Sequence, residues 1–149
     1  MIRKAKIKDV QVIHELINHY AKAGDMLPRS LNQLYEELQN FYVVEKNKKV
    51  IGCCALDITW EDLAEIKALA VSPEFARKGY GQMLVKQCLL NAKWLGIKRV
   101  FALTFKLGFF KKMGFKTINK DKLPHKIWSE CIRCPFFPNC NEIAVIKNI

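Results

Sequence analysis

The spacing of apolar residues predicts a strand and two helices before residue 40. Residues 2–7 alternate between apolar and polar side chains, as in a strand. Apolar residues then recur at helical spacing from Val10 to Tyr20, and Asp9 stands where an N-cap would accept the first free N–H groups. A second helical stripe, residues 31–38, follows Ser30, which we expect to cap that helix.

After residue 40 the apolar spacing becomes that of strands. Phe41 to Glu45 and Val50 to Asp57 are rich in β-branched and aromatic residues and flank a polar Lys-Asn-Lys-Lys turn, a pattern typical of a hairpin. Leu63 to Val71, LAEIKALAV, predicts a third strand in this series. Because this strand is long and apolar, we expect it at the centre of the sheet.

Helices and strands alternate in the rest of the chain. Gly79 to Gly96 carries a helical stripe that Gly96 ends at a C-cap position. Arg99 to Phe105 predicts a strand, Phe109 to Lys112 a short helix stopped by Gly114, and Ile143 to Ile146 a last strand. The predicted order is β-α-α-β-β-β-α-β-α-β.

Length and composition predict one domain over residues 1–149. The chain has 149 residues, half of them hydrophobic, with no apolar run of about 18 residues that could span a membrane. The N-terminus lacks the apolar stretch and cleavage site of a secretory signal. We therefore expect a cytoplasmic protein with no membrane partner.

The net charge of +11 has two interpretations. It arises from 25 Lys and Arg against 14 Asp and Glu, and it fits either a solvated lysine-rich surface or an anionic ligand such as nucleic acid. The lysines are scattered along the chain, whereas nucleic-acid binding favours clustered cations with interleaved aromatics. We therefore expect no nucleic-acid partner.

Residues 71–85, VSPEFARKGYGQMLV, place two glycines between a predicted strand and a predicted helix. The first turn of a helix offers unpaired N–H groups to a phosphate, and Gly79 and Gly81 let the backbone approach its oxygens. Arg77 and Lys78 add positive charge there. The third glycine of a dinucleotide-binding loop and the G-K-[ST] of a Walker loop are both absent.

This loop resembles the acetyl-CoA pyrophosphate loop of the GNAT acetyltransferases, Q/R-x-x-G-x-G/A, although Ala76 stands at the Q/R position. Residues 109–115, FFKKMGF, resemble a further family pattern, and the resemblance covers Met1 to about Ile118. It implies an α/β GNAT fold with a mixed central sheet of about six or seven strands flanked by helices. It also implies acetyl-CoA as co-substrate, with no metal required. The implied cofactor-binding residues are Leu69, Ala70, Val71, Arg77, Lys78, Gly79, Tyr80, Gly81, Gln82, Phe109 and Phe110.

Several longer blocks are similar to the short, stand-alone bacterial N-acetylglutamate synthases. They are RSLNQLYEELQNFYVVE, IGCCALDITWEDLAEIKALAV, KRVFALTF and LGFFKKMGF. This resemblance implies an amino-acid N-acetyltransferase that acetylates the α-amine of L-glutamate by direct transfer, the first step of arginine biosynthesis. The alternatives are another small amine, a protein amine, or a non-catalytic CoA-binding module. A small molecule is the expected partner, and a homodimer is the assembly considered.

A glutamate acceptor carries two carboxylates, so its site needs cations. The candidates are Arg29, which suits bidentate recognition best, then Lys67 on the central strand, then Lys106 after the next strand. Solvated surface charge is the alternative for each. A regular pleat would put Ile66, Ala68 and Ala70 on one face of the sheet and Lys67, Leu69 and Val71 on the other.

Glu65 is the candidate general base, at a position where many GNAT enzymes use a glutamate that acts through water. A structural ion pair with a lysine is the alternative for Glu65, and His14 and His19 are weaker candidates for the base. The family also implies an oxyanion-binding N–H around residues 69–71, where a bulge splays the central strand from its neighbour. The position of the usual tyrosine acid is Phe110, so the thiolate is expected to leave unprotonated.

The six cysteines divide into two groups. Cys53, Cys54 and Cys88 lie in apolar patterns and should be buried as small hydrophobes. The other three belong to residues 119–149, which we interpret as a Cys-rich extension packed on the domain. We favour reduced structural thiols there, and the alternative is a zinc site formed by His125, Cys131, Cys134 and Cys140.

Overall fold

The structure is a computed structural model, and it describes residues 1–123 and 142–149. Its strands and helices follow the predicted order, with one short strand added before the last. The elements are β1 (Ile2–Lys4), α1 (Val10–Lys22), α2 (Leu31–Glu37), β2 (Phe41–Lys46), β3 (Lys49–Trp60), β4 (Leu63–Val71), α3 (Tyr80–Leu95), β5 (Arg99–Thr104), α4 (Leu107–Lys112), β6 (Lys116–Thr117) and β7 (Ile143–Asn148).

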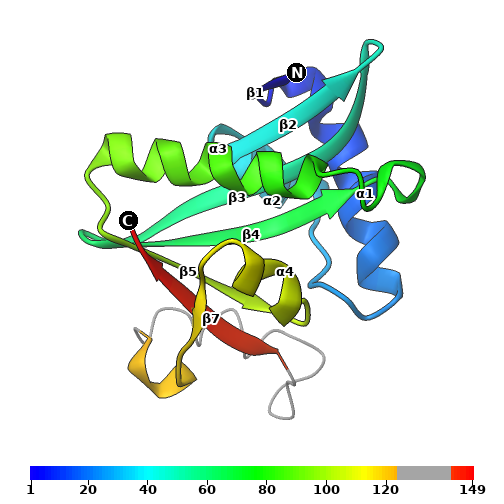
Figure 1. Ribbon diagram of the computed structural model, residues 1–149. Helices are drawn as coiled ribbons and strands as arrows, with labels where there is room; N and C mark the ends of the chain where they lie inside the picture. The colour runs from blue at the N-terminus through cyan, green and yellow to red at the C-terminus, as the bar shows by residue number, and fades with distance from the viewer. Residues whose placement is uncertain (124–141) are drawn as a thin grey trace.

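The seven strands form one mixed sheet in the order β1-β2-β3-β4-β5-β7-β6. The pair β4–β5 is parallel and the other pairs are antiparallel. Helices α3 and α4 cover one face of the sheet and α1 and α2 the other (Figure 1). The predicted central position of the third long strand is confirmed, because β4 has three strands on each side.

Two apolar cores hold the helices to the sheet. One lies under α3 and α4 and the other under α1 and α2, and each fully buried aliphatic or aromatic side chain contributes about 1.5–3 kcal/mol of transfer free energy. Cys53, Cys54 and Cys88 are fully buried, as predicted. Burial raises the pKa of Cys53 to about 12, so this side chain stays a thiol and packs as a small apolar group.

Local signals explain most element ends. Ser30 accepts a hydrogen bond from the Gln33 N–H at 3.1 Å, and the Gln33 side chain accepts from the Ser30 N–H at 2.9 Å, which confirms Ser30 as the cap of α2. Asn47 and Lys48 both have positive φ, as the two-residue hairpin turn between β2 and β3 requires. Gly96 ends α3 with a φ of 91°, also as predicted.

Asp9 is the N-cap residue of α1, as predicted, but the expected capping bond is absent. A short 3-10 turn, Ile7–Asp9, precedes α1, and the Asp9 carboxylate makes no capping bond to that helix. It accepts hydrogen bonds from the Lys6 N–H at 2.7 Å and from the Arg3 guanidinium at 2.7 and 3.1 Å. The turn thus directs the carboxylate back toward β1, where it fixes the first strand to the start of α1.

The predicted alternation of faces along β4 is wrong. Lys67 pairs with Ala55 and Ala70 with Cys53, so a single β3 residue lies opposite both Ala68 and Leu69. This is a β-bulge, and Ala68 has a φ of 55°. The extra residue resets the alternation, so that Ala68 and Ala70 pack in the core beneath α1 and α2, whereas Ile66, Leu69 and Val71 contact the core beneath α3.

The sheet divides beside the bulge. Parallel pairing between β4 and β5 extends only from Leu63 opposite Arg99 to Glu65 opposite Phe101. Beyond that point the two strands diverge. The predicted bulge and splay are therefore present, and they leave the last part of β4 with an edge that β5 does not pair.

Candidate active site

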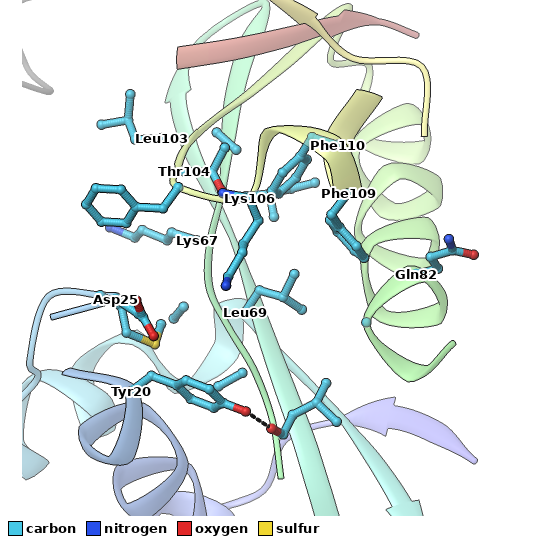
Figure 2. Close-up of a pocket in the computed structure, with 18 of the residues that line it drawn as sticks. Tyr20, Asp25, Lys67, Leu69, Gln82, Leu103, Thr104, Lys106, Phe109 and Phe110 are labelled. Carbon is cyan, nitrogen blue, oxygen red and sulfur yellow. Dashed lines mark hydrogen bonds between the residues drawn. The ribbon is translucent and has the colours of Figure 1, made fainter. Parts of the chain in front are cut away.

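A cavity of about 940 Å³ occupies the opening between β4 and β5 (Figure 2). Its walls come from residues 65–71 of β4, residues 102–106 at and after the end of β5, the segment between α1 and α2, the loop before α3, and α4. This volume lies at the upper end of the range of about 300–1,000 Å³ typical of small-molecule sites. The cavity therefore has room for an extended ligand that meets both strands.

The predicted phosphate loop forms one end of this cavity. Gly79 is the N-cap residue of α3 with a φ of 89°, and Arg77 also has a positive φ, of 62°. Each of the predicted cofactor-binding residues lines the cavity except Lys78, whose ammonium lies 5.6 Å from the centre of the Phe75 ring. The loop thus presents the N-terminus of a 16-residue helix to the cavity, the geometry that suits an anion.

Two phenylalanines form the wall opposite this helix end. The Phe109 ring faces Gly81, where a Cβ atom would lie 3.4 Å from it. Phe110 is 4% exposed, and its ring stands edge-on to Phe109 and Phe115, each with ring centres 5.1 Å apart. The position expected for an acid is therefore occupied by a core aromatic residue, which has no proton to donate.

Glu65 lies at the point where β4 and β5 separate. It is the last β4 residue paired with β5, it is 8% exposed, and it lines the cavity. A carboxylate at this vertex is mostly shielded from solvent and borders the space that a ligand would enter. His14 and His19 belong to a separate shallow hollow on α1 and do not line this cavity.

Arg29 and Lys67, two of the three predicted carboxylate-binding cations, lie near one another, and each forms an ion pair with an acidic residue. Arg29 Nη1 donates to both Glu37 carboxylate oxygens, at 2.8 and 3.1 Å, and Lys67 Nζ contacts Asp57 Oδ2. Glu37 and Asp57 are not among the residues that line the cavity, whereas both cations are. Each carboxylate therefore orients a cation toward the cavity.

Opposing effects act on the pKa of Lys67. Burial lowers it, and the nearby Arg29 charge lowers it further. The charge of Asp57, with its hydrogen bond, and the charge of Glu65 raise it and prevail, so the net pKa lies above the ordinary lysine value. Lys67 therefore keeps its positive charge across the physiological pH range.

Lys106 comes from a different part of the wall. It is the N-cap residue of α4, and Figure 2 shows its side chain extending toward Leu69 on β4. The side chain of Lys67 runs in another direction, toward the side where Asp25 lies (Figure 2). The three predicted cations thus line one cavity, but Lys106 does not join the pair formed by Arg29 and Lys67.

Tyr20 and Asp57 border the site and were not predicted from the sequence as site residues. Tyr20 on α1 donates its hydroxyl to the Val71 carbonyl, as the dashed line in Figure 2 marks, and burial together with the charge of Asp25 raises the pKa of Tyr20. Asp57 lies opposite Glu65 in the β3–β4 pair. Only the hairpin register could have indicated Asp57, and nothing in the helical spacing separates Tyr20 from a core residue.

No group of three or more His, Cys, Asp or Glu side chains within residues 1–123 and 142–149 is arranged to hold a metal ion. The alternative zinc ligands His125, Cys131, Cys134 and Cys140 lie outside the described residues. In the same described part of the chain, no helix combines the length and apolar character needed to cross a membrane.

Known proteins are similar to this chain in sequence and in fold. A family model described as acetyltransferase (GNAT) domain matches residues 37–117. An uncharacterized N-acetyltransferase of Chlorobaculum tepidum is 40% identical over 99% of this chain and 96% of its own length. An amino-acid acetyltransferase of Mycobacterium tuberculosis is 37% identical over 89% of this chain and 78% of its own length.

A solved structure is similar to this chain in its fold. N-acetylglutamate synthase from Neisseria gonorrhoeae, complexed with coenzyme A and N-acetyl-glutamate, matches 99% of this chain with a TM-score of 0.91 and 30% identity. This chain corresponds to 34% of that protein's length. A relative with a similar fold has therefore been solved in complex with coenzyme A.

Proposed function

This chain belongs to the GNAT acetyltransferases, and from that premise we propose that it transfers the acetyl group of acetyl-CoA to the α-amine of L-glutamate. The observation that carries the choice of acceptor is the pair formed by the buried Arg29 and the partly buried Lys67, two cations that line the same cavity as Glu65. The expected place in metabolism is the first step of arginine biosynthesis. The names of the relatives agree with an amino-acid acceptor.

Acetyl-CoA would occupy the opening between β4 and β5. Its pyrophosphate would bind the backbone N–H groups from Gly79 to Gln82 at the start of α3, with Arg77 as an added cation. Its pantetheine arm would run along the edge of β4 that β5 leaves unpaired, beside Phe109. A backbone N–H within residues 69–71 would then stabilise the oxyanion that develops on the acetyl carbonyl.

Glutamate would enter from the side of α1 and α2. Arg29 and Lys67 would bind its carboxylates, and Arg29 is suited to this because its planar guanidinium carries five N–H donors in an arrangement that matches a carboxylate. Glu65 would take the proton of the α-amine through a water molecule. The amine nitrogen would then attack the thioester carbon directly.

Acetyl-CoA turnover with separate amino acids tests the acceptor. Removing the side-chain carboxylate leaves a cation in the cavity without its charged partner, and a hydrogen bond to a charged group is worth about 1.5–3 kcal/mol. We therefore expect kcat/KM for glutamate to exceed that for glutamine by at least about tenfold, with aspartate also a poor acceptor because of its shorter side chain. Equal rates for the three would reject glutamate as the acceptor.

Binding of CoA to the same preparation provides the control. Titration calorimetry without any acceptor reports the cofactor site alone. Tight CoA binding with no glutamate turnover would locate the error in the acceptor, whereas absent CoA binding would indicate an inactive preparation.

A further inference from the structure

The cavity wall formed by α4 carries two aromatic rings and two lysines, Lys106 at the start of the helix and Lys112 at its end. Phe109 and Phe110 supply the rings, and neither can carry charge. Acetyl transfer from a thioester breaks a C–S bond and leaves a sulfur anion beside this wall. A cation on this side of the cavity would stabilise that negative charge.

Lys106 is held so that its side chain starts from a fixed position. Its backbone N–H donates to the buried Thr104 Oγ1 at 2.7 Å, and its carbonyl accepts from the Phe110 N–H at 3.3 Å. From there the side chain extends across the opening between the strands toward Leu69 (Figure 2). Leu69 directly follows the bulge residue, at the edge of β4 where the strands have parted.

We propose that the ammonium group of Lys106 stabilises the CoA thiolate as it leaves, and thereby acts as a catalytic residue for the transfer. The thioester has to lie beside the unpaired part of β4 for its carbonyl to meet a backbone N–H there. With the carbonyl on β4, the sulfur lies between β4 and α4. This is the space into which the Lys106 side chain extends.

The chemistry balances without another reactant. The amine nitrogen forms a bond to the carbonyl carbon, its proton passes through water to Glu65, and the C–S bond then breaks with its electron pair going to sulfur. A thiol, with an ordinary pKa of about 8.5, is a stronger acid than an alkylammonium, at about 10.4. Charge pairing is therefore favoured over proton transfer, and the thiolate takes its proton from solvent after release.

The other ionisable groups of the cavity are placed less well for this role. Glu65 and Lys67 come from β4, and Lys67 is engaged by Asp57. Tyr20 and Asp25 come from the side of α1, and Arg29 is bound to Glu37. Lys112 lies at the end of α4 opposite to Lys106, and Arg77, Tyr80, Lys120 and Glu142 complete the set along the remaining walls. Of the two cations that Figure 2 labels, Lys106 extends toward Leu69 and Lys67 runs in another direction.

The ionisation of bound CoA tests this inference without any acceptor, so it does not depend on glutamate being the substrate. The thiolate absorbs ultraviolet light, and a pH titration of CoA at saturating protein gives the pKa of the bound thiol. An opposite charge nearby lowers a pKa by about 1–3 units. We expect the bound thiol to titrate at least about one unit below free CoA, and Lys106→Met to remove that difference.

Two further variants make the result specific. Lys106→Arg keeps a cation and should retain most of the lowered thiol pKa, whereas Lys111→Met removes an exposed α4 lysine that does not line the cavity and should change nothing. Thermal melts confirm that each variant is folded. A bound thiol pKa that is the same in the parent protein and in Lys106→Met would overturn the proposal.

Steady-state kinetics separate this role from binding of an acceptor carboxylate. Stabilisation of the leaving thiolate predicts that Lys106→Met lowers kcat about tenfold or more, with the KM of the acceptor nearly unchanged. An increase in acceptor KM with kcat preserved would instead assign Lys106 to the acceptor and contradict the inference.

Discussion

Two carboxylates that do not line the cavity orient two of the cations that do. Glu37 binds Arg29 and Asp57 binds Lys67, and neither acid lines the cavity. A buried lysine without a partner would lose its proton readily, because burial disfavours the charged form. Asp57 is therefore a positioning residue, and its effect should appear in how the acceptor binds.

Replacing Asp57 by Asn should raise the KM for glutamate about tenfold near neutral pH, since Lys67 loses its orienting partner. The pH dependence has a defined sign. In the parent protein the raised pKa keeps Lys67 charged as the pH increases. In the variant burial and Arg29 still lower that pKa, and only the smaller effect of the Glu65 charge opposes them. Acceptor binding should therefore weaken at a lower pH in the variant, as KM measured across alkaline buffers would reveal.

The matched control is Asp62→Asn. Asp62 pairs with Arg99 at 3.3 Å in an exposed salt bridge that is remote from the cavity lining. Because exposed pairs contribute about 0–1 kcal/mol, this variant should leave both stability and the pH profile of KM unchanged. Identical pH profiles of KM for Asp57→Asn and the parent protein would show that Asp57 does not position Lys67 for acceptor binding.

Glu65→Gln should lower kcat about 100-fold near neutral pH, because a positioned general base contributes about 10²–10⁴. The glutamine keeps the shape of the side chain but cannot accept the amine proton. The loss should be largest at low pH and should diminish as the acceptor amine deprotonates in solution. A pH–rate profile parallel to that of the parent protein would show that Glu65 is not the base.

At the scale of elements, the bulge in β4 creates the opening. It holds Ala68 at a φ of 55°, a left-handed conformation that costs a non-glycine residue roughly 1–2 kcal/mol. Deletion of Ala68 would leave Leu69 opposite Cys54 and would keep every later side chain on its present face. The same strand would then be regular and without the bend, and the core beneath α1 and α2 would lose only the Ala68 methyl group.

Deletion of Ala68 should therefore give a folded protein that no longer binds CoA, because β4 can continue pairing with β5 beyond Glu65 and close the opening. Thermal melts and calorimetry measure the two properties separately. Ala68→Gly is the control, since it keeps the bulge and relieves the strained φ. It should bind CoA normally and change stability by no more than about 1 kcal/mol. Normal CoA binding after the deletion would show that the bulge is dispensable.

Element order was predictable from the sequence because each element carries its own local signal. Ser30 with Gln33, the Asn47–Lys48 turn and Gly96 each fix an end by nearby hydrogen bonds or backbone conformation. The pleat of β4 was not predictable from its own spacing, because the bulge depends on pairing with β3. The hydrogen bonds of the Asp9 carboxylate were not predictable for a similar reason, since its partner Arg3 lies on another element.

At the scale of the whole molecule, the sequence predicted the cavity better than the contacts within it. Nearly all the expected cofactor residues line one opening, because a strand, a glycine loop and a helix follow one another along the chain. Tyr20 and Glu37 were missed because they reach the site only through packing of α1 and α2 against the sheet. Those two helices cover the end of the cavity that we propose for the acceptor, so the acceptor is the least predictable part of the function.

The net charge of +11 fits this arrangement without a nucleic-acid partner. Acetyl-CoA and glutamate are both anionic, and a basic protein raises their local concentration and their association rates. The cations that line the cavity, among them Arg29, Lys67, Arg77 and Lys106, come from four separate segments of the chain. Their convergence on one opening connects the overall charge with the proposed pair of substrates.

A competition experiment tests the central claim most directly. The protein is incubated with acetyl-CoA and an equimolar mixture of the twenty amino acids, and the acetylated products are quantified by mass spectrometry. The structure and the relatives together lead us to expect N-acetylglutamate as the main product, about tenfold or more above any other. Products spread evenly over several amino acids, or acetylation of another amino acid in preference to glutamate, would contradict the proposed function.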